Sequence, residues 1–199
     1  ADVTRDVGTV KTDYNATDSS VWSGIILGGV PILNNDSFLD PPQSWNAVAG
    51  EFEDLPNWSG TDYAAHIGSY KQYMVALDIT KSTGREPHTV KWSSPALPGT
   101  VPDFWDNADT NDSNEQPLSE GGGILISQQA LADTNIIYKE EATYGMQLVG
   151  GPFVLKFYKI FDQRGILDPR CSKEFFNKHF VVTKSDVIVH DGQRAESVI

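Results

Sequence analysis

Oxygen-bearing side chains alternate in the acidic stretch DFWDNADTNDSNEQPLSEGGG, which runs from Asp103 to Gly123. Every second residue in part of it is a possible ligand for a hard cation such as Ca²⁺. These residues are Asp109, Asn111, Ser113 and Glu115. An EF-hand loop needs a glycine after its third ligand, but Asn114 stands there and no glutamate closes the loop. The match to a calcium loop is thus imperfect, and we favour a long, mobile, solvated connection near residues 96–123.

Tryptophans offer a second kind of chemistry. Trp45, Trp58 and Trp105 lie in the polar segments SWNA, PNWSG and DFWDN. An indole face stacks on a sugar ring or fills a partner's pocket, and nearby acids and amides add directional hydrogen bonds. The polar neighbours considered for this role are Asp106, Asp109 and Asn111. The alternative is that the three rings close the ends of a β-sheet core.

Catalytic signatures are sparse. The histidines His66, His88, His179 and His190 show no metal-ligand spacing, which favours surface or cross-strand positions. Cys171 is the only thiol, and a buried structural role is favoured over a nucleophile. No catalytic residue is assigned, and the enzymatic alternative is a hydrolase whose site is assembled only in three dimensions.

Composition limits the partners. The formal net charge of −12 argues against nucleic-acid binding through this domain, which needs a concentrated basic face. The longest apolar run, Ile25–Leu33, is interrupted by glycine and proline and is too short for membrane insertion. N-glycosylation sequons begin at Asn15, Asn35, Asn57 and Asn111.

Strands dominate the expected structure. In Tyr73–Thr80, alternation places Tyr73, Val75, Leu77 and Ile79 on one face of a half-buried strand. The run Phe153–Phe161 predicts a long strand near the centre of a sheet. Further strands are expected at 22–27, 89–92, 124–128, 136–140, 180–183 and 187–190, the last two joined as a hairpin through 184–186.

Helix signals are limited to two short segments. Pro41–Ala49 combines an initiating proline with a terminating Gly50, and a second helix is expected over Ser172–Asn177. The pattern as a whole predicts one all-β domain over residues 1–199, an antiparallel sandwich, jelly roll or barrel with a polar tail at 191–199.

This organisation resembles the projecting or shell domains of coat proteins from small non-enveloped RNA viruses. The resemblance is carried by Trp92–Pro95 before the acidic stretch, by the strand FVLKFYKIF, and by the closing strands HFVVTKSDVIVHDGQ. It implies a non-enzymatic module on the virion surface that forms dimers or trimers and attaches to a host glycan or protein receptor. The basic arm that precedes many shell domains is missing from the sequence. A carbohydrate-binding module or lectin-like domain of a secreted protein is the alternative.

Overall fold

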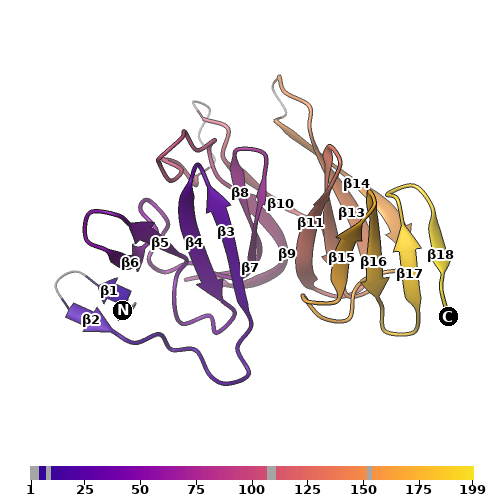
Figure 1. The fold of residues 1–199 in the computed structure, drawn as a ribbon, viewed down its shortest axis with the longest axis horizontal. Coiled ribbons are helices and arrows are strands. Elements are labelled where there is room, and N and C mark those ends of the chain that lie inside the picture. Colours follow the sequence, from indigo (N-terminus) through magenta and orange to yellow (C-terminus); the bar gives the residue numbers. More distant parts are fainter. Residues whose placement is uncertain (1–4, 8–9, 107–110, 152–153) are drawn as a thin grey trace. The chain divides into compact units, whose positions relative to one another are not determined.

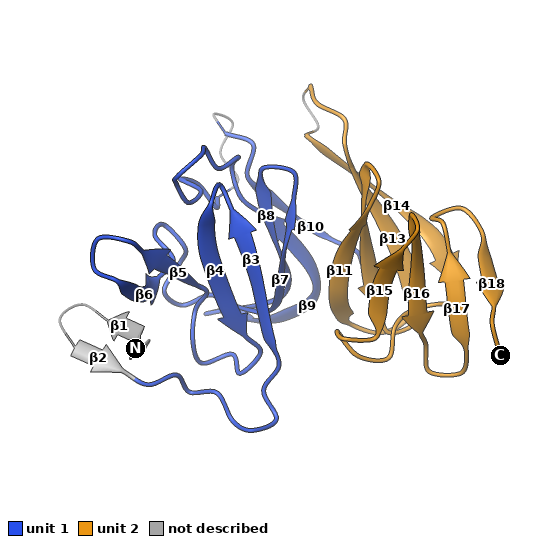
Figure 2. Cartoon of the chain, viewed as in Figure 1, with its two compact units in different colours: residues 1–118 blue, residues 119–199 orange. Residues whose placement is uncertain are grey.

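The chain is built from β-strands (Figure 1). The computed structural model describes residues 5–7, 10–106, 111–151 and 154–199. The secondary-structure elements within these residues are all β-strands. Within that part of the chain, no helix is long and apolar enough to cross a membrane. The all-β class predicted from hydrophobic alternation is confirmed. The chain forms two compact units, residues 1–118 (unit 1) and 119–199 (unit 2) (Figure 2).

Unit 1 contains two sheets. In the six-stranded sheet the order is β2-β1-β6-β5-β4-β3, with all pairs antiparallel except β1 with β6. Its strands are β1 (Arg5–Val7), β2 (Val10–Thr12), β3 (Trp22–Leu27), β4 (Val30–Asn35), β5 (Gln43–Asn46) and β6 (Glu51–Asp54). The second sheet is antiparallel with the order β10-β9-β8-β7. Its strands are β7 (Tyr63–Tyr70), β8 (Tyr73–Lys81), β9 (Gly84–Trp92) and β10 (Asn114–Pro117).

The unit 1 core joins these two sheets. Ile32 of β4, Ile67 of β7 and Met74 of β8 are at most 2% exposed and belong to one apolar cluster. Burial of such side chains contributes about 25 cal/mol for each Å² of apolar surface removed from water. The cluster therefore holds the two sheets together.

Strand β8 differs from its predicted half-buried pattern. All residues from Tyr73 to Ile79 are at most 7% exposed, because β8 is an internal strand and both of its faces are covered. The pairing of β8 with β9 shifts between Leu77 and Ile79, and Asp78 adopts a positive φ of 56°. This bulge reverses the alternation, so Ile79 joins Met74 in the core cluster, and its predicted place on the face of Leu77 is wrong.

Unit 2 contains two antiparallel four-stranded sheets, with the orders β11-β12-β13-β14 and β15-β16-β17-β18. The first consists of β11 (Leu125–Leu131), β12 (Thr134–Lys139), β13 (Ala142–Leu148) and β14 (Leu155–Asp162). The second consists of β15 (Ser172–Phe175), β16 (Lys178–Val182), β17 (Val187–His190) and β18 (Ala195–Ser197). The predicted hairpin through residues 184–186 is confirmed by the pairing of β16 with β17.

The unit 2 core takes side chains from both of its sheets. Ile136 and Tyr138 of β12 are buried in one cluster with Val181 of β16 and Ile188 of β17. Strand β14 lies at the edge of its sheet, so the prediction of a central strand at 153–161 is wrong. The strongly apolar sequence of β14 reflects its packing against one neighbour and the core, where Ile160 is partly buried.

Both predicted helices are strands. The segment 41–49 contains β5, and 172–177 contains β15 followed by a tight turn. In each case cross-strand pairing outweighs the short local helix signal, because an isolated helix of this length is marginal in water. Two expected irregular segments also contain strands: β10 lies within 96–123 and β18 within 191–199.

Candidate functional site

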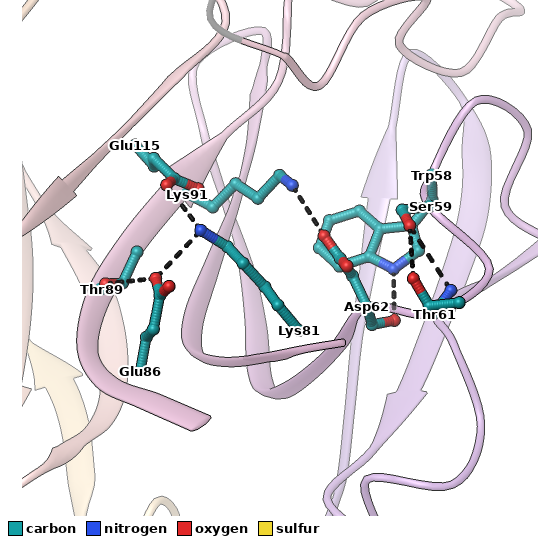
Figure 3. Close-up of polar contacts among 9 residues, drawn as sticks. All are labelled: Trp58, Ser59, Thr61, Asp62, Lys81, Glu86, Thr89, Lys91 and Glu115. Atoms are coloured by element: carbon teal, nitrogen blue, oxygen red, sulfur yellow. Dashed lines mark hydrogen bonds and ion pairs between the residues drawn. The ribbon is translucent and has the colours of Figure 1, made fainter. Parts of the chain in front are cut away.

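Two of the predicted ligand-binding tryptophans lie in the core of unit 1. Trp58 and Trp105 are 7% and 5% exposed, and their rings meet edge to face with centroids 4.7 Å apart. The Trp58 Nε1 donates a hydrogen bond of 2.7 Å to the carbonyl oxygen of Asp62 (Figure 3). The structure thus places both rings in the positions expected for core closure and leaves neither of them as an open stacking surface.

Trp58 also covers a buried ion pair. The Lys91 ammonium lies 3.1 Å from an Asp62 carboxylate oxygen and 5.2 Å from the centre of the Trp58 ring (Figure 3). The two charged side chains are only 10% and 11% exposed. Because a lone buried charge is costly, each partner stabilises the other, and the aromatic face adds a cation–π contact.

The remaining predicted contact residues are more accessible. Trp45 in β5 is half-buried and packs edge to face on Phe52 at 5.3 Å. Asp106 is exposed, and its Oδ1 accepts a 3.4 Å hydrogen bond from the Asn111 amide. Asp109 lies outside the described residues. Because Trp58 and Trp105 are buried, the three predicted tryptophans do not form one open surface.

The calcium candidate is largely engaged in other contacts. The Ser113 hydroxyl donates to the Asp106 carbonyl and also contacts Asn111 Oδ1. Glu115, in β10, forms an ion pair with Lys81, with 2.6 Å between its Oε1 and the Lys81 Nζ. The same Nζ lies 3.0 Å from Glu86 Oε2 (Figure 3). No cluster of three or more His, Cys, Asp or Glu side chains suited to a metal occurs among the described residues.

Three of the sequons differ in their surroundings. Asn35 is 2% exposed and donates to Asp40, so its amide is inaccessible to a glycosyltransferase in the folded chain. Asn15 also donates to Asp40, at 2.8 Å. Asn57 is exposed in a turn with a positive φ of 63°.

Unit 2 contains a buried hydrogen-bonded network that the sequence analysis did not identify. His179 and His190 face each other on β16 and β17, which confirms a cross-strand position for this pair. Both ring nitrogens that point inward lie 2.7 Å from the hydroxyl of Tyr138. All three side chains are at most 1% exposed.

The outer contacts fix the direction of every proton in this network. The amide of Gly192 donates to His190 Nδ1, so the neutral His190 carries its proton on Nε2 and donates to Tyr138. His179 Nε2 donates to the carbonyl of Ala130, so its Nδ1 accepts from the Tyr138 hydroxyl. The hydrogen bonds therefore run from His190 through Tyr138 to His179. In each imidazole ring the unprotonated nitrogen accepts a hydrogen bond, so neither ring can take up a second proton without losing that bond.

The pKa values agree with this geometry. Burial, reinforced by His179, lowers the pKa of His190 to about 4, and burial also lowers the pKa of His179. Burial raises the pKa of Tyr138 well above its ordinary value. All three groups thus stay neutral at pH 7, which suits a structural network better than proton transfer.

The outer face of the β15–β16 hairpin exposes apolar side chains in unit 2. Phe175 pairs with Lys178, so the connection consists of only Phe176 and Asn177. Their φ angles are 48° and 58°, as a two-residue type I′ turn requires. A bulky phenylalanine is uncommon and strained in this region of φ.

The same hairpin forms an open groove, which we call the Phe–Lys groove. It has a volume of about 490 Å³ and is lined by Lys173, Phe175, Phe176, Lys178, Phe180 and Val189. Phe175, Phe176 and Phe180 are 67%, 84% and 44% exposed. Alternation explains the arrangement, because His179 and Val181 point into the core while Lys178 and Phe180 point outward.

The sequence pattern predicts a helix over 172–177 and therefore gives no indication of the Phe–Lys groove. The signal that would reveal it is the matched pattern Lys173, Phe175 and Lys178, Phe180 on the two sides of the two-residue turn Phe176–Asn177. That turn lacks a glycine, and Phe176 occupies a position where asparagine or glycine is usual. The hairpin signal was consequently weak.

Comparison with known proteins yields no family assignment: no protein-family model matches the chain, and no curated protein matches it.

Proposed function

We propose that this chain is a non-enzymatic structural and recognition module of the outward-facing capsid or spike type, built on β-sandwiches. It takes part in capsid assembly and attaches the virion to a glycan or protein receptor of the host. Its expected location is the virion surface or another extracellular setting. The Phe–Lys groove is the observation that carries this proposal, because an exposed cluster of aromatic side chains on a sheet is typical of a protein interaction surface.

The test measures association and attachment separately. Light scattering over a range of concentrations, with calcium or with a chelator, reports whether copies associate and whether the Asn111–Glu115 segment contributes. Flow cytometry with the chain displayed on fluorescent particles reports attachment to a panel of cell lines. Association together with attachment supports the proposal. A chain that stays monomeric and attaches to no cell line contradicts it.

A carbohydrate-binding module is the second candidate, and Trp45 favours it. Trp45 is the one predicted tryptophan that is not buried, because it is half-exposed in β5. A glycan array separates the candidates: a monomeric chain whose glycan binding disappears in Trp45→Ala is a carbohydrate-binding module. The hydrolase alternative has no comparable support.

A further inference from the structure

An exposed aromatic side chain in unit 1 has the chemistry to fill the Phe–Lys groove. Phe104 is 51% exposed and lies between the exposed acids Asp103 and Asp106. We call Asp103–Asp106 the Phe104 turn. It offers an apolar ring bordered by negative charge, whereas the groove offers apolar rings bordered by lysines.

The Phe104 turn is held firmly by its surroundings. The amide of Phe104 donates to the Ser94 hydroxyl at 3.1 Å, and its carbonyl accepts from the Ser94 amide at 2.9 Å. The next residue, Trp105, is anchored in the core beside Trp58. The backbone that carries the exposed Phe104 ring is therefore fixed, which lowers the entropy cost of docking.

The charges of the groove select an anionic partner. Lys173 and Lys178 are exposed, and among the described residues neither forms an ion pair, although Lys178 interacts electrostatically with the exposed Asp191. Two copies that met groove to groove would bring these lysines together, which is unfavourable. A partner with carboxylates beside an aromatic ring avoids this repulsion and fills the apolar space.

We propose that the Phe104 turn of one copy docks into the Phe–Lys groove of a second copy of this chain. Phe104 packs against Phe175 and Phe180, while Asp103 and Asp106 approach Lys173 and Lys178. The proposal rests on the proposed function, which it deepens by naming the two surfaces through which copies join. The contact is heterologous, so copies form either a closed ring or an open chain.

Charge reversal gives a direct test by light scattering. Lys173→Glu/Lys178→Glu changes the groove, and Asp103→Lys/Asp106→Lys changes the turn, without altering buried residues. Each variant alone is expected to associate about ten-fold more weakly than the original chain, because like charges now meet. A mixture of the two variants restores association, since each reversed surface then meets its opposite.

Two further variants separate docking from folding. Phe176→Asn/Asn177→Gly introduces the preferred type I′ residues, so it removes an aromatic wall of the groove while favouring the hairpin. It is expected to weaken association and to leave thermal stability equal or higher. Val48→Ser, at a residue that is 99% exposed, is the matched control and leaves association unchanged.

Several results would overturn the inference. If association is strong but insensitive to both charge reversals, copies join through other surfaces, and the proposed function survives without this contact. If the mass stays at 21.9 kDa at every concentration, the second copy is not the occupant. The monomer could instead bind vesicles of phosphatidylserine and phosphatidylcholine. If the Phe176→Asn/Asn177→Gly variant no longer binds these vesicles, the groove is a lipid-binding site.

Discussion

At the scale of single residues, the hydroxyl of Tyr138 completes the buried network of unit 2. Tyr138→Phe leaves the Nε2–H of His190 and the Nδ1 of His179 without partners. The expected loss of unfolding free energy is about 2–4 kcal/mol, because each buried unpaired group costs about 1–3 kcal/mol. Urea unfolding measures it. Tyr158→Phe, in β14 of the same unit, is the control and should change the unfolding free energy by less than about 0.5 kcal/mol.

The same histidines make stability depend on pH. The folded pKa of His190 is about 4, below its ordinary value of 6.5, so the unfolded chain binds the proton first as pH falls. His190 therefore contributes its full stabilisation above pH 6.5 and loses about 3 kcal/mol as pH falls toward 4. NMR titration of the imidazole signals tests this. A midpoint near 6.5 for His190 in the folded chain would contradict the buried network.

Asp62 and Lys91 form a buried ion pair, and replacing only one of the two residues is expected to lower the free energy of unfolding. Asp62→Asn or Lys91→Met leaves one charge buried beside Trp58, and each is expected to cost about 3–5 kcal/mol. The double variant should cost clearly less than the sum of the two. Chemical denaturation of the four chains in this cycle gives the coupling. Additive losses would show that the two charges do not depend on each other.

At the scale of elements, one close approach of backbones fixes how the segment after β14 meets β12. A Cβ added at Gly165 would lie 2.2 Å from the carbonyl oxygen of Lys139 and 2.4 Å from the carbonyl carbon of Glu140. Backbone atoms cannot move aside as a side chain can, so Gly165→Ala is expected to cost about 3 kcal/mol. Gly60→Ala is the matched control, because nothing lies within 4 Å of the added atom. Equal thermal midpoints for the two variants would contradict this packing.

Alternation located eight of the eighteen strands that the structure describes, but could not give their neighbours. Strands β3 and β17 coincide with the ranges predicted at 22–27 and 187–190. The bulge at Asp78 was invisible because the buried carboxylate depends on a two-point contact with Arg85, which the spacing of apolar residues does not report. The edge position of β14 was equally hidden, since apolar sequence indicates burial and not the order of strands.

The candidate site was harder to predict than the fold. Tryptophans in polar segments looked accessible, yet Trp58 and Trp105 pack on each other through contacts between distant parts of the sequence. The exposed aromatic residues include Trp22, Phe104 and the phenylalanines of a short hairpin whose turn has no glycine. Local composition therefore did not indicate which aromatic residues are exposed, because exposure is decided by tertiary packing.

At the scale of the whole molecule, charge is unevenly distributed along the chain. Residues 1–118 contain 6 basic and 17 acidic residues, whereas residues 119–199 contain 9 and 10. The net charges are thus −11 and −1, which together give the −12 of the chain. Association that brings the acidic Phe104 turn of one copy to the lysines of another is consistent with this division. Association between two acidic surfaces is unfavourable, because their negative charges repel each other.

This distribution predicts how salt changes association. Between 0.05 and 0.5 M NaCl the screening length falls from roughly 14 Å to roughly 4 Å, so the attraction between Asp103, Asp106 and the two groove lysines weakens. The apolar contact of Phe104 persists, and we therefore expect the dissociation constant to rise about ten-fold without complete loss of association. Sedimentation at increasing salt measures the change. Association that strengthens with salt would mean that repulsion between acidic surfaces dominates, and that the docking surface does not include the Phe104 turn.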